Sequence, residues 1–225
     1  MKYHQKHLST CLFAIAALLG GASPAWAQVS LGTASGFSVL GGTAVTCTAG
    51  SVVGDLGISP GITASFTNTG CTIAGGTPPA TNAAAASART DFLNAYAAIQ
   101  SAYCTQMLGG TLADLILAPG IYCVDAVAKT GTLTLTGPSD GVWIFLVDGA
   151  LTGTNFSVVM EGGGQPANVF WAPSAGATMT TSVFQGNILA GDAIDGSITL
   201  TGGTLAGRAL ANVAVTMTTA SVIGR

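Results

Sequence analysis

Histidine, charge and long apolar runs are scarce in this sequence, and each shortage excludes a class of function. Both histidines, His4 and His7, lie in the first 27 residues. The rest of the chain therefore cannot form a Ser-His-Asp or Cys-His catalytic site or a histidine-ligated metal site. Against nine acids, only four cations follow that segment, which are Arg89, Lys129, Arg208 and Arg225. The difference, four minus nine or −5, argues against a nucleic-acid partner, whose phosphates attract clustered Lys and Arg.

No apolar run reaches the roughly 18 residues that a membrane-spanning helix needs, so we expect no membrane partner. The longest run, Cys11–Gly20, follows Lys2 and Lys6 and precedes Ala25-Trp26-Ala27. A basic start, a short apolar stretch and an A-x-A site are typical of a secretory signal peptide. We therefore expect residues 1–27 to be removed by cleavage near Ala27 and residues 28–225 to form a single secreted, extracellular domain.

Cysteine is sparse beyond the signal peptide, and the number there is even. The four residues are Cys47, Cys71, Cys104 and Cys123. In an exported chain this number predicts two disulfides. Three pairings are possible, and we favour bonding between sequence neighbours, Cys47 with Cys71 and Cys104 with Cys123. No C-x2-C spacing indicates a metal site, so we expect neither a metal nor another cofactor.

Glycine, threonine, valine and alanine are abundant and stand in short alternating runs, which favours strands and turns. The candidate strands include Thr132–Gly137, Val142–Asp148, Asn168–Pro173 and Asn187–Ile194. One segment differs: residues 82–104 are rich in alanine and lack glycine and proline. There, helical spacing aligns four side chains on one stripe, those of Phe92, Tyr96, Ile99 and Tyr103. We expect one long helix that packs on a mainly β body.

A motif of eight residues recurs along the β-rich part of the chain. Five octets share threonine at position 2 and an apolar residue at position 6, and four of them end on glycine: Cys47–Gly54, Leu151–Val158, Met179–Gly186, Leu200–Gly207 and Met217–Gly224. The last four start at intervals of 28, 21 and 17 residues. Self-similarity at about 20 residues is typical of a solenoid, in which stacked coils bury a common interior.

Stacking would bring equivalent octet positions about 4.8 Å apart. Position 2 then forms one column, Thr48, Thr152, Thr180, Thr201 and Thr218, and position 5 another, Ser51, Asn155, Val183, Thr204 and Ser221. Positions 1 and 6 are both apolar but an odd number of residues apart, so a bend must lie between them, and small residues at positions 3 and 4 permit it. The candidate site comprises these columns without Val183 and with Ser182. Unlike an ordinary solvated face, it carries no charge.

Further segments match one known family in their order along the chain. They are Gly36–Gly61, Leu117–Asp125, Gly141–Thr152, Asn168–Ala190 and Gly202–Ala211, with the alanine-rich helix between the first two. With these segments the chain resembles the secreted microbial ice-binding proteins of the single-domain type. The resemblance implies a mainly β fold, a right-handed discontinuous β-solenoid (β-helix) with one long α-helix packed alongside.

Some members of that family carry T-A/G-x-T/N motifs on the ice-binding face. Thr152–Asn155 and Thr201–Thr204 match this motif, and Thr48–Ser51 matches it if serine replaces threonine. Thr180–Val183 and Thr218–Ser221 depart from it. The resemblance implies an antifreeze protein, not an enzyme, whose partner is the ice crystal surface and whose effects are thermal hysteresis and inhibition of ice recrystallisation. We expect a monomer.

Two alternative functions stay open. One is a secreted structural or adhesive solenoid module, and the other is a polysaccharide-active β-helix enzyme. The enzyme is disfavoured because such sites gather several acids in one groove, whereas the nine acids here are scattered among expected turns. The nearest pair, Asp192 and Asp195, is interpreted as turn residues.

Overall fold

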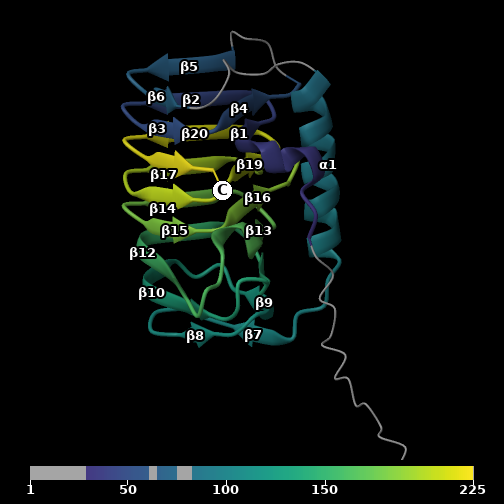
Figure 1. Ribbon diagram of the computed structural model, residues 1–225, viewed down its shortest axis with the longest axis vertical. Helices are drawn as coiled ribbons and strands as arrows, with labels where there is room; N and C mark the ends of the chain where they lie inside the picture. The colour runs from purple at the N-terminus through teal and green to yellow at the C-terminus, as the bar shows by residue number, and fades with distance from the viewer. Residues whose placement is uncertain (1–28, 61–64, 75–82, 225) are drawn as a thin grey trace, which may run out of the picture.

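The computed structural model describes residues 29–60, 65–74 and 83–224. The expected signal peptide, residues 1–27, lies outside this part of the chain. The described strands pair only in parallel, and they stack into coils along the long axis of the molecule (Figure 1). The prediction of a mainly β solenoid with one long helix is confirmed.

Each complete coil contributes to three faces. The first face is an eight-stranded sheet in the order β4 (Asp55–Ile58), β1 (Phe37–Gly41), β19 (Ala209–Ala211), β16 (Asn187–Ala190), β13 (Val169–Pro173), β11 (Trp143–Val147), β9 (Gly120–Val124) and β7 (Gln106–Leu108). The second face contains β5 (Phe66–Thr69), β2 (Ala44–Thr48), β20 (Ala214–Thr218), β17 (Ile198–Thr201), β14 (Ala177–Thr180) and the start of β12 (Leu151–Glu161).

The third face adjoins the second along the edge where each coil bends. It contains β6 (Thr72–Ala74), β3 (Ser51–Val53), β21 (Ser221–Ile223), β18 (Thr204–Ala206), β15 (Val183–Gln185), the rest of β12, β10 (Lys129–Thr136) and β8 (Ile116–Leu117). Because β12 pairs with β14 at one end and with β15 at the other, it runs round the bend without a break.

The order of coils in the stack differs from their order in the sequence. Strand β20, late in the sequence, lies between β2, which is early in the sequence, and β17. In Figure 1 the yellow C-terminal strands accordingly stand between the blue N-terminal strands and the green middle of the chain. The solenoid is therefore discontinuous, as expected, and the chain crosses from one end of the stack to the other through the helix.

Helix α1 (Ala83–Gln100) packs along the outer side of the first face. Ala88, Phe92 and Ile99 are buried against apolar residues of that sheet, together with the short 3-10 turn η1 (Gly32–Gly36). This explains why strands such as β13 and β16 are buried at every residue, since parallel sheets covered on both sides are apolar throughout. Among the described residues, no helix is both long enough and apolar enough to cross a membrane.

The predicted helix was too long at its C-terminal end. It ends at Gln100, and Tyr103 is 93% exposed, so it does not extend the buried stripe. The amide of Ala102 donates to the carbonyl of Ile99 in a tightened last turn. Cys104 is bonded to Cys123 in β9, which draws the chain away from the helix axis. The predicted strand 187–194 is likewise too long, because β16 ends at Ala190 and Ile194 is 83% exposed in a turn.

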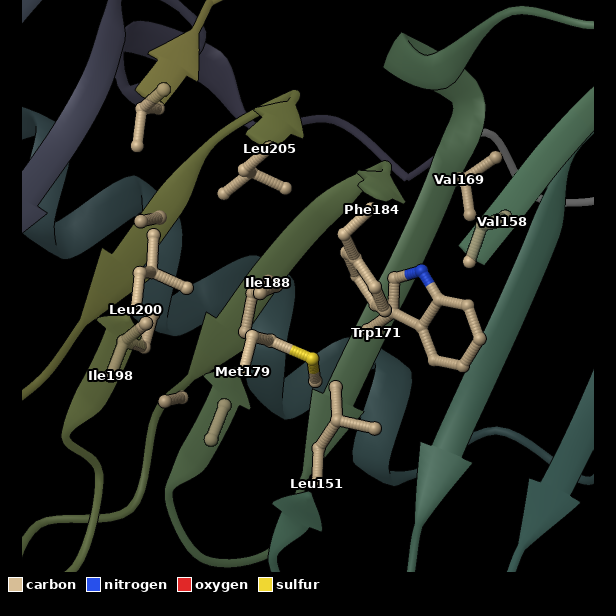
Figure 2. Close-up of a cluster of buried hydrophobic side chains, with 14 of the residues drawn as sticks. Leu151, Val158, Val169, Trp171, Met179, Phe184, Ile188, Ile198, Leu200 and Leu205 are labelled. Atoms are coloured by element: carbon tan, nitrogen blue, oxygen red, sulfur yellow. The ribbon is translucent and has the colours of Figure 1, made fainter. Parts of the chain in front are cut away.

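The interior of the coils is filled by apolar side chains from all three faces. Leu200, Met179 and Phe184 point inward from different strands and meet Trp171 and Ile188 of the first face (Figure 2). The rings of Phe145 and Trp171 stack with centroids 3.8 Å apart. A further short 3-10 turn, η3 (Pro166–Asn168), precedes β13. The tryptophans at 143 and 171 are fully buried and are therefore core residues.

The two disulfides join sequence neighbours, as predicted. Cys47 of β2 bonds to Cys71, between β5 and β6, with a Cα–Cα distance of 5.9 Å. Cys104 bonds to Cys123 of β9, with a Cα–Cα distance of 5.4 Å. They fasten opposite ends of the stack, since β5 ends one sheet and β7, beside β9, ends the other.

Candidate functional site

Twelve threonines cover the second face of the solenoid. Each of its six strands carries the pattern T-x-T, and the register places these residues side by side. The first rank is Thr67, Thr46, Thr216, Thr199, Thr178 and Thr152, and the second rank is Thr69, Thr48, Thr218, Thr201, Thr180 and Thr154. We call these twelve residues the Thr face.

Alternation along the strands explains why the threonines point outward. In β20 the flanking Val215 and Met217 are fully buried, while Thr216 and Thr218 are half-buried. Residues two apart on a strand lie about 6.6 Å apart along it, and neighbouring strands lie about 4.8 Å apart. The parallel ladder therefore holds hydroxyl and methyl groups in a regular two-dimensional array. Because threonine is β-branched, its χ1 angle is also restricted.

The register brings together most of the predicted position 2 column. Thr48 pairs with Thr218, Thr218 with Thr201, and Thr201 with Thr180. The prediction is wrong for the octet Leu151–Val158, which is displaced by two residues. Thr154, not Thr152, lies beside Thr180, and Thr152 lies beside Thr178 in the first rank.

Packing gives the reason for this displacement. Leu151 is fully buried in the same column as Ala177 and Ile198. Gly153 is the residue that falls opposite Met179, and a Cβ atom there would lie 2.6 Å from the Met179 sulfur. Glycine thus leaves room for the methionine side chain, which an octet aligned at Leu151 could not do.

The bend predicted between octet positions 1 and 6 occurs at position 3. Residues there have positive φ angles, from 47° to 64°: Ala49, Thr219, Gly202, Thr181 and, after the displacement, Asn155. Gly70, which follows Thr69 of β5, has a φ angle of 76° at the equivalent place. Asn155 was predicted at position 5, on the surface beyond the bend, and instead lies on the bend itself. The hydroxyl of Thr181 donates to the side-chain oxygen of Asn155.

The remaining predicted residues do not lie on the Thr face. Ser51, Thr204 and Ser221 form a column on the third face, beyond the bend. Ser182 is only 3% exposed, and its hydroxyl is bonded to the Thr180 carbonyl and the Phe156 amide. It therefore supports the bend from inside and cannot contact a ligand at the surface.

Sequence reasoning missed more than half of the Thr face. The missed residues are the first rank apart from Thr152, with Thr69 and Thr154 of the second rank. The signal was present as a repeated T-x-T at 46–48, 67–69, 152–154, 178–180, 199–201 and 216–218. It was obscured because four octets began one residue before the second threonine of the pattern, whereas Leu151–Val158 began one residue before the first. Strand β5 also belongs to a sixth copy, since Asn68–Ala74 has threonine at position 2 and isoleucine at position 6.

None of the twelve residues of the Thr face is charged, and several charged side chains elsewhere serve local structure. Asp192 Oδ1 accepts hydrogen bonds from the backbone amides of Ile194 and Asp195 at 2.8 and 2.6 Å. This confirms that Asp192 and Asp195 belong to a turn. The Asp195 amide is the largest cause of the lowered pKa of Asp192. Lys129 is fully buried and bonds to Asp125 Oδ1 at 2.8 Å, and this bond is the largest cause of the lowered Asp125 pKa.

The part of the chain that the structure describes offers no metal-binding cluster. No group of three or more His, Cys, Asp or Glu side chains there has the geometry to hold a metal ion. What the second face offers instead is a regular, uncharged array of one residue type. Such a surface can order water or dock a repetitive solid, and it holds no group able to transfer a proton near neutral pH.

Comparison with known proteins gives a consistent result. A model of the ice-binding-like family matches residues 39–223. An ice-binding protein of Nostoc sp. (strain HG1) is 40% identical over 201 residues, which cover 85% of this chain and 72% of that protein.

Solved structures agree with this match. The crystal structure of an ice-binding protein from the Antarctic ascomycete Antarctomyces psychrotrophicus has a TM-score of 0.78 at 29% identity and covers 87% of this chain and 98% of its own. One from an Antarctic biological consortium has a TM-score of 0.77 at 29% identity and covers 98% and 96%. The stacked fold and the family match lead to one conclusion: the chain belongs to the ice-binding-like family of proteins.

Proposed function

We propose that this protein binds ice through the Thr face and so produces thermal hysteresis and inhibits ice recrystallisation. The observation that carries the proposal is the array of twelve threonines in two ranks across six parallel strands. Family membership supports the same activity.

The array acts by holding water in an ordered layer. Threonine hydroxyls anchor water molecules by hydrogen bonds, while the methyl groups between them limit how those molecules reorient. Each hydrogen bond contributes only about 1 kcal/mol net, because it replaces a bond to bulk water. Many contacts must therefore act together, and a stiff scaffold keeps the ordering cost low. Protein adsorbed on a growing crystal makes the ice front curve between the attached molecules, which lowers the freezing point.

We further propose that the protein works outside the cell as a monomer without a cofactor. The composition of residues 1–27 supports export. The six-strand width of the Thr face supports action by a single copy, because all twelve threonines come from one chain.

Substitution of Thr201 by tyrosine tests the Thr face directly. Thr201 is exposed in β17, an inner strand of the array, and a ring there would hold ice away from the neighbouring threonines. Loss of several contacts of about 1 kcal/mol should weaken adsorption tenfold or more. We expect most of the hysteresis and recrystallisation inhibition to disappear while the circular dichroism spectrum is unchanged.

The matched control is Thr90→Tyr on the exposed side of helix α1, which packs on the first face. It should keep full activity. Full activity of folded Thr201→Tyr would refute the assignment of the face. A structural or adhesive module would be indicated if crystals grown in the unsubstituted protein showed neither faceting nor arrested growth.

A further inference from the structure

The outermost strand of the Thr face, β5, is held by fewer buried side chains than the inner strands. Thr67, Asn68 and Thr69 are all exposed, and only Phe66 packs against the interior. In the inner strands β14, β17 and β20, the residue between the two threonines is a buried apolar anchor: Met179, Leu200 or Met217. In β5 that position is Asn68, which is polar and exposed. Strand β5 also ends the sheet, with β2 as its paired neighbour.

A disulfide is present beside β5, the strand that lacks this apolar anchor. Cys47 occupies the equivalent position in β2, between Thr46 and Thr48, and is fully buried. It is bonded to Cys71, which lies two residues after Thr69. Cys71 is at octet position 4, the inward side of the bend. The disulfide therefore links the buried side of β2, beneath Thr46 and Thr48, to the bend that follows Thr69 of β5.

Hydrogen bonds extend the effect of this link to β5. The Cys71 amide donates to Asn68 Oδ1 at 2.8 Å, and Asn68 Nδ2 donates to the Cys71 carbonyl at 3.2 Å. The Gly50 amide donates to Cys71 Sγ at 3.0 Å. Asn68, which replaces the apolar anchor in β5, is thus hydrogen-bonded to Cys71 of the disulfide.

We propose that Cys47 and Cys71 are positioning residues for ice binding, because their disulfide keeps the outermost row, Thr67 and Thr69, in the plane of the Thr face. This inference rests on the proposed function. A row here means the two threonines of one strand. With the disulfide, the Thr face presents six such rows to ice; without it, β5 opens locally and only five rows can bind. Fewer rows mean fewer simultaneous contacts and weaker adsorption.

The test compares Cys47→Ala/Cys71→Ala with Cys104→Ala/Cys123→Ala, which removes the other disulfide at the far end of the stack. Both variants lose a disulfide, but only the first loses one that links β2 of the Thr face to the bend after β5. We expect amide exchange at Thr67–Thr69 to rise about tenfold or more in the first variant, as for local opening, and to stay unchanged in the second. Hysteresis should fall in the first variant by as much as in Thr67→Ala/Thr69→Ala, and stay near the unsubstituted value in the second.

Combining Cys47→Ala/Cys71→Ala with Thr67→Ala/Thr69→Ala should add little further loss, because both changes disable the same row. Equal loss of hysteresis in the two disulfide variants would overturn the proposal, since it would reflect stability alone. Unchanged exchange in β5 would overturn it too. If β5 exchanged faster but Thr201→Tyr stayed fully active, the positioning of the strand would stand and the ice-binding assignment of the Thr face would fail.

Discussion

At the scale of single residues, the site depends on what lies behind each threonine. Gly153 is required by the neighbouring Met179 side chain, and Ser182 by the bonds it makes inside the bend. Neither role could be predicted from the octet alignment, because LTGT at 151–154 fits it in two registers. The choice between the registers is made by burial of Leu151, which depends on the neighbouring coils.

The bend also contains strained residues. Thr181 and Thr219 have φ angles of 47° and 50°, a region that β-branched side chains disfavour. Asparagine, which occupies the equivalent position at 155, tolerates it better. We expect Thr219→Asn to raise the free energy of unfolding by about 1 kcal/mol, measured by urea denaturation. Thr154→Asn, in a strand, should not raise it; equal stabilisation by both changes would contradict the explanation.

At the scale of elements, the helix and most strands were predictable because their periodicities are local. The C-terminal ends of β16 and of helix α1 were less predictable. The chain after Ala190 turns where Gly191 faces the ring of Tyr96, a contact between segments far apart in sequence. The order of coils was not predictable either, because the octets show which segments are alike but not which are neighbours.

Docking of helix α1 on the first face can be tested at Gly191. A Cβ atom there would overlap the Tyr96 ring, whose hydroxyl donates to the Pro173 carbonyl at 3.1 Å. Gly191→Ala should lower the free energy of unfolding by about 2 kcal/mol through overpacking, measured by chemical denaturation. Gly36→Ala is the control, since a Cβ atom at that position would have no neighbour within 4 Å. Equal effects of the two changes would argue against this packing.

At the scale of the whole molecule, stability and surface chemistry respond differently to pH. The pKa values of Asp91, Asp125 and Asp192 are lowered, chiefly by hydrogen bonds from Thr33, Lys129 and the Asp195 amide respectively. Depressed carboxyl pKa values contribute stability above the unfolded value, about 3.9, and this contribution is lost as the pH falls through the folded values. The Thr face has no group that titrates in this range.

We therefore expect the melting temperature to be nearly constant from about pH 5 to 7 and to fall below about pH 4, as measured by calorimetry. Hysteresis should not change between about pH 5 and 9. A hysteresis that tracked carboxyl titration, while the protein stayed folded, would show that an acidic side chain takes part in binding.

The position of β20 has a consequence for the newly made protein. This strand lies near the C-terminus, yet it separates β2 from β17 in the middle of the array. Until its residues have been synthesised, no strand on this face joins the threonines of β5 and β2 to those of β17, β14 and β12. The Thr face is completed only when Ala214–Thr218 emerges, after its other five strands, so a product terminated before this segment would carry ten of the twelve threonines and still lack a continuous plane.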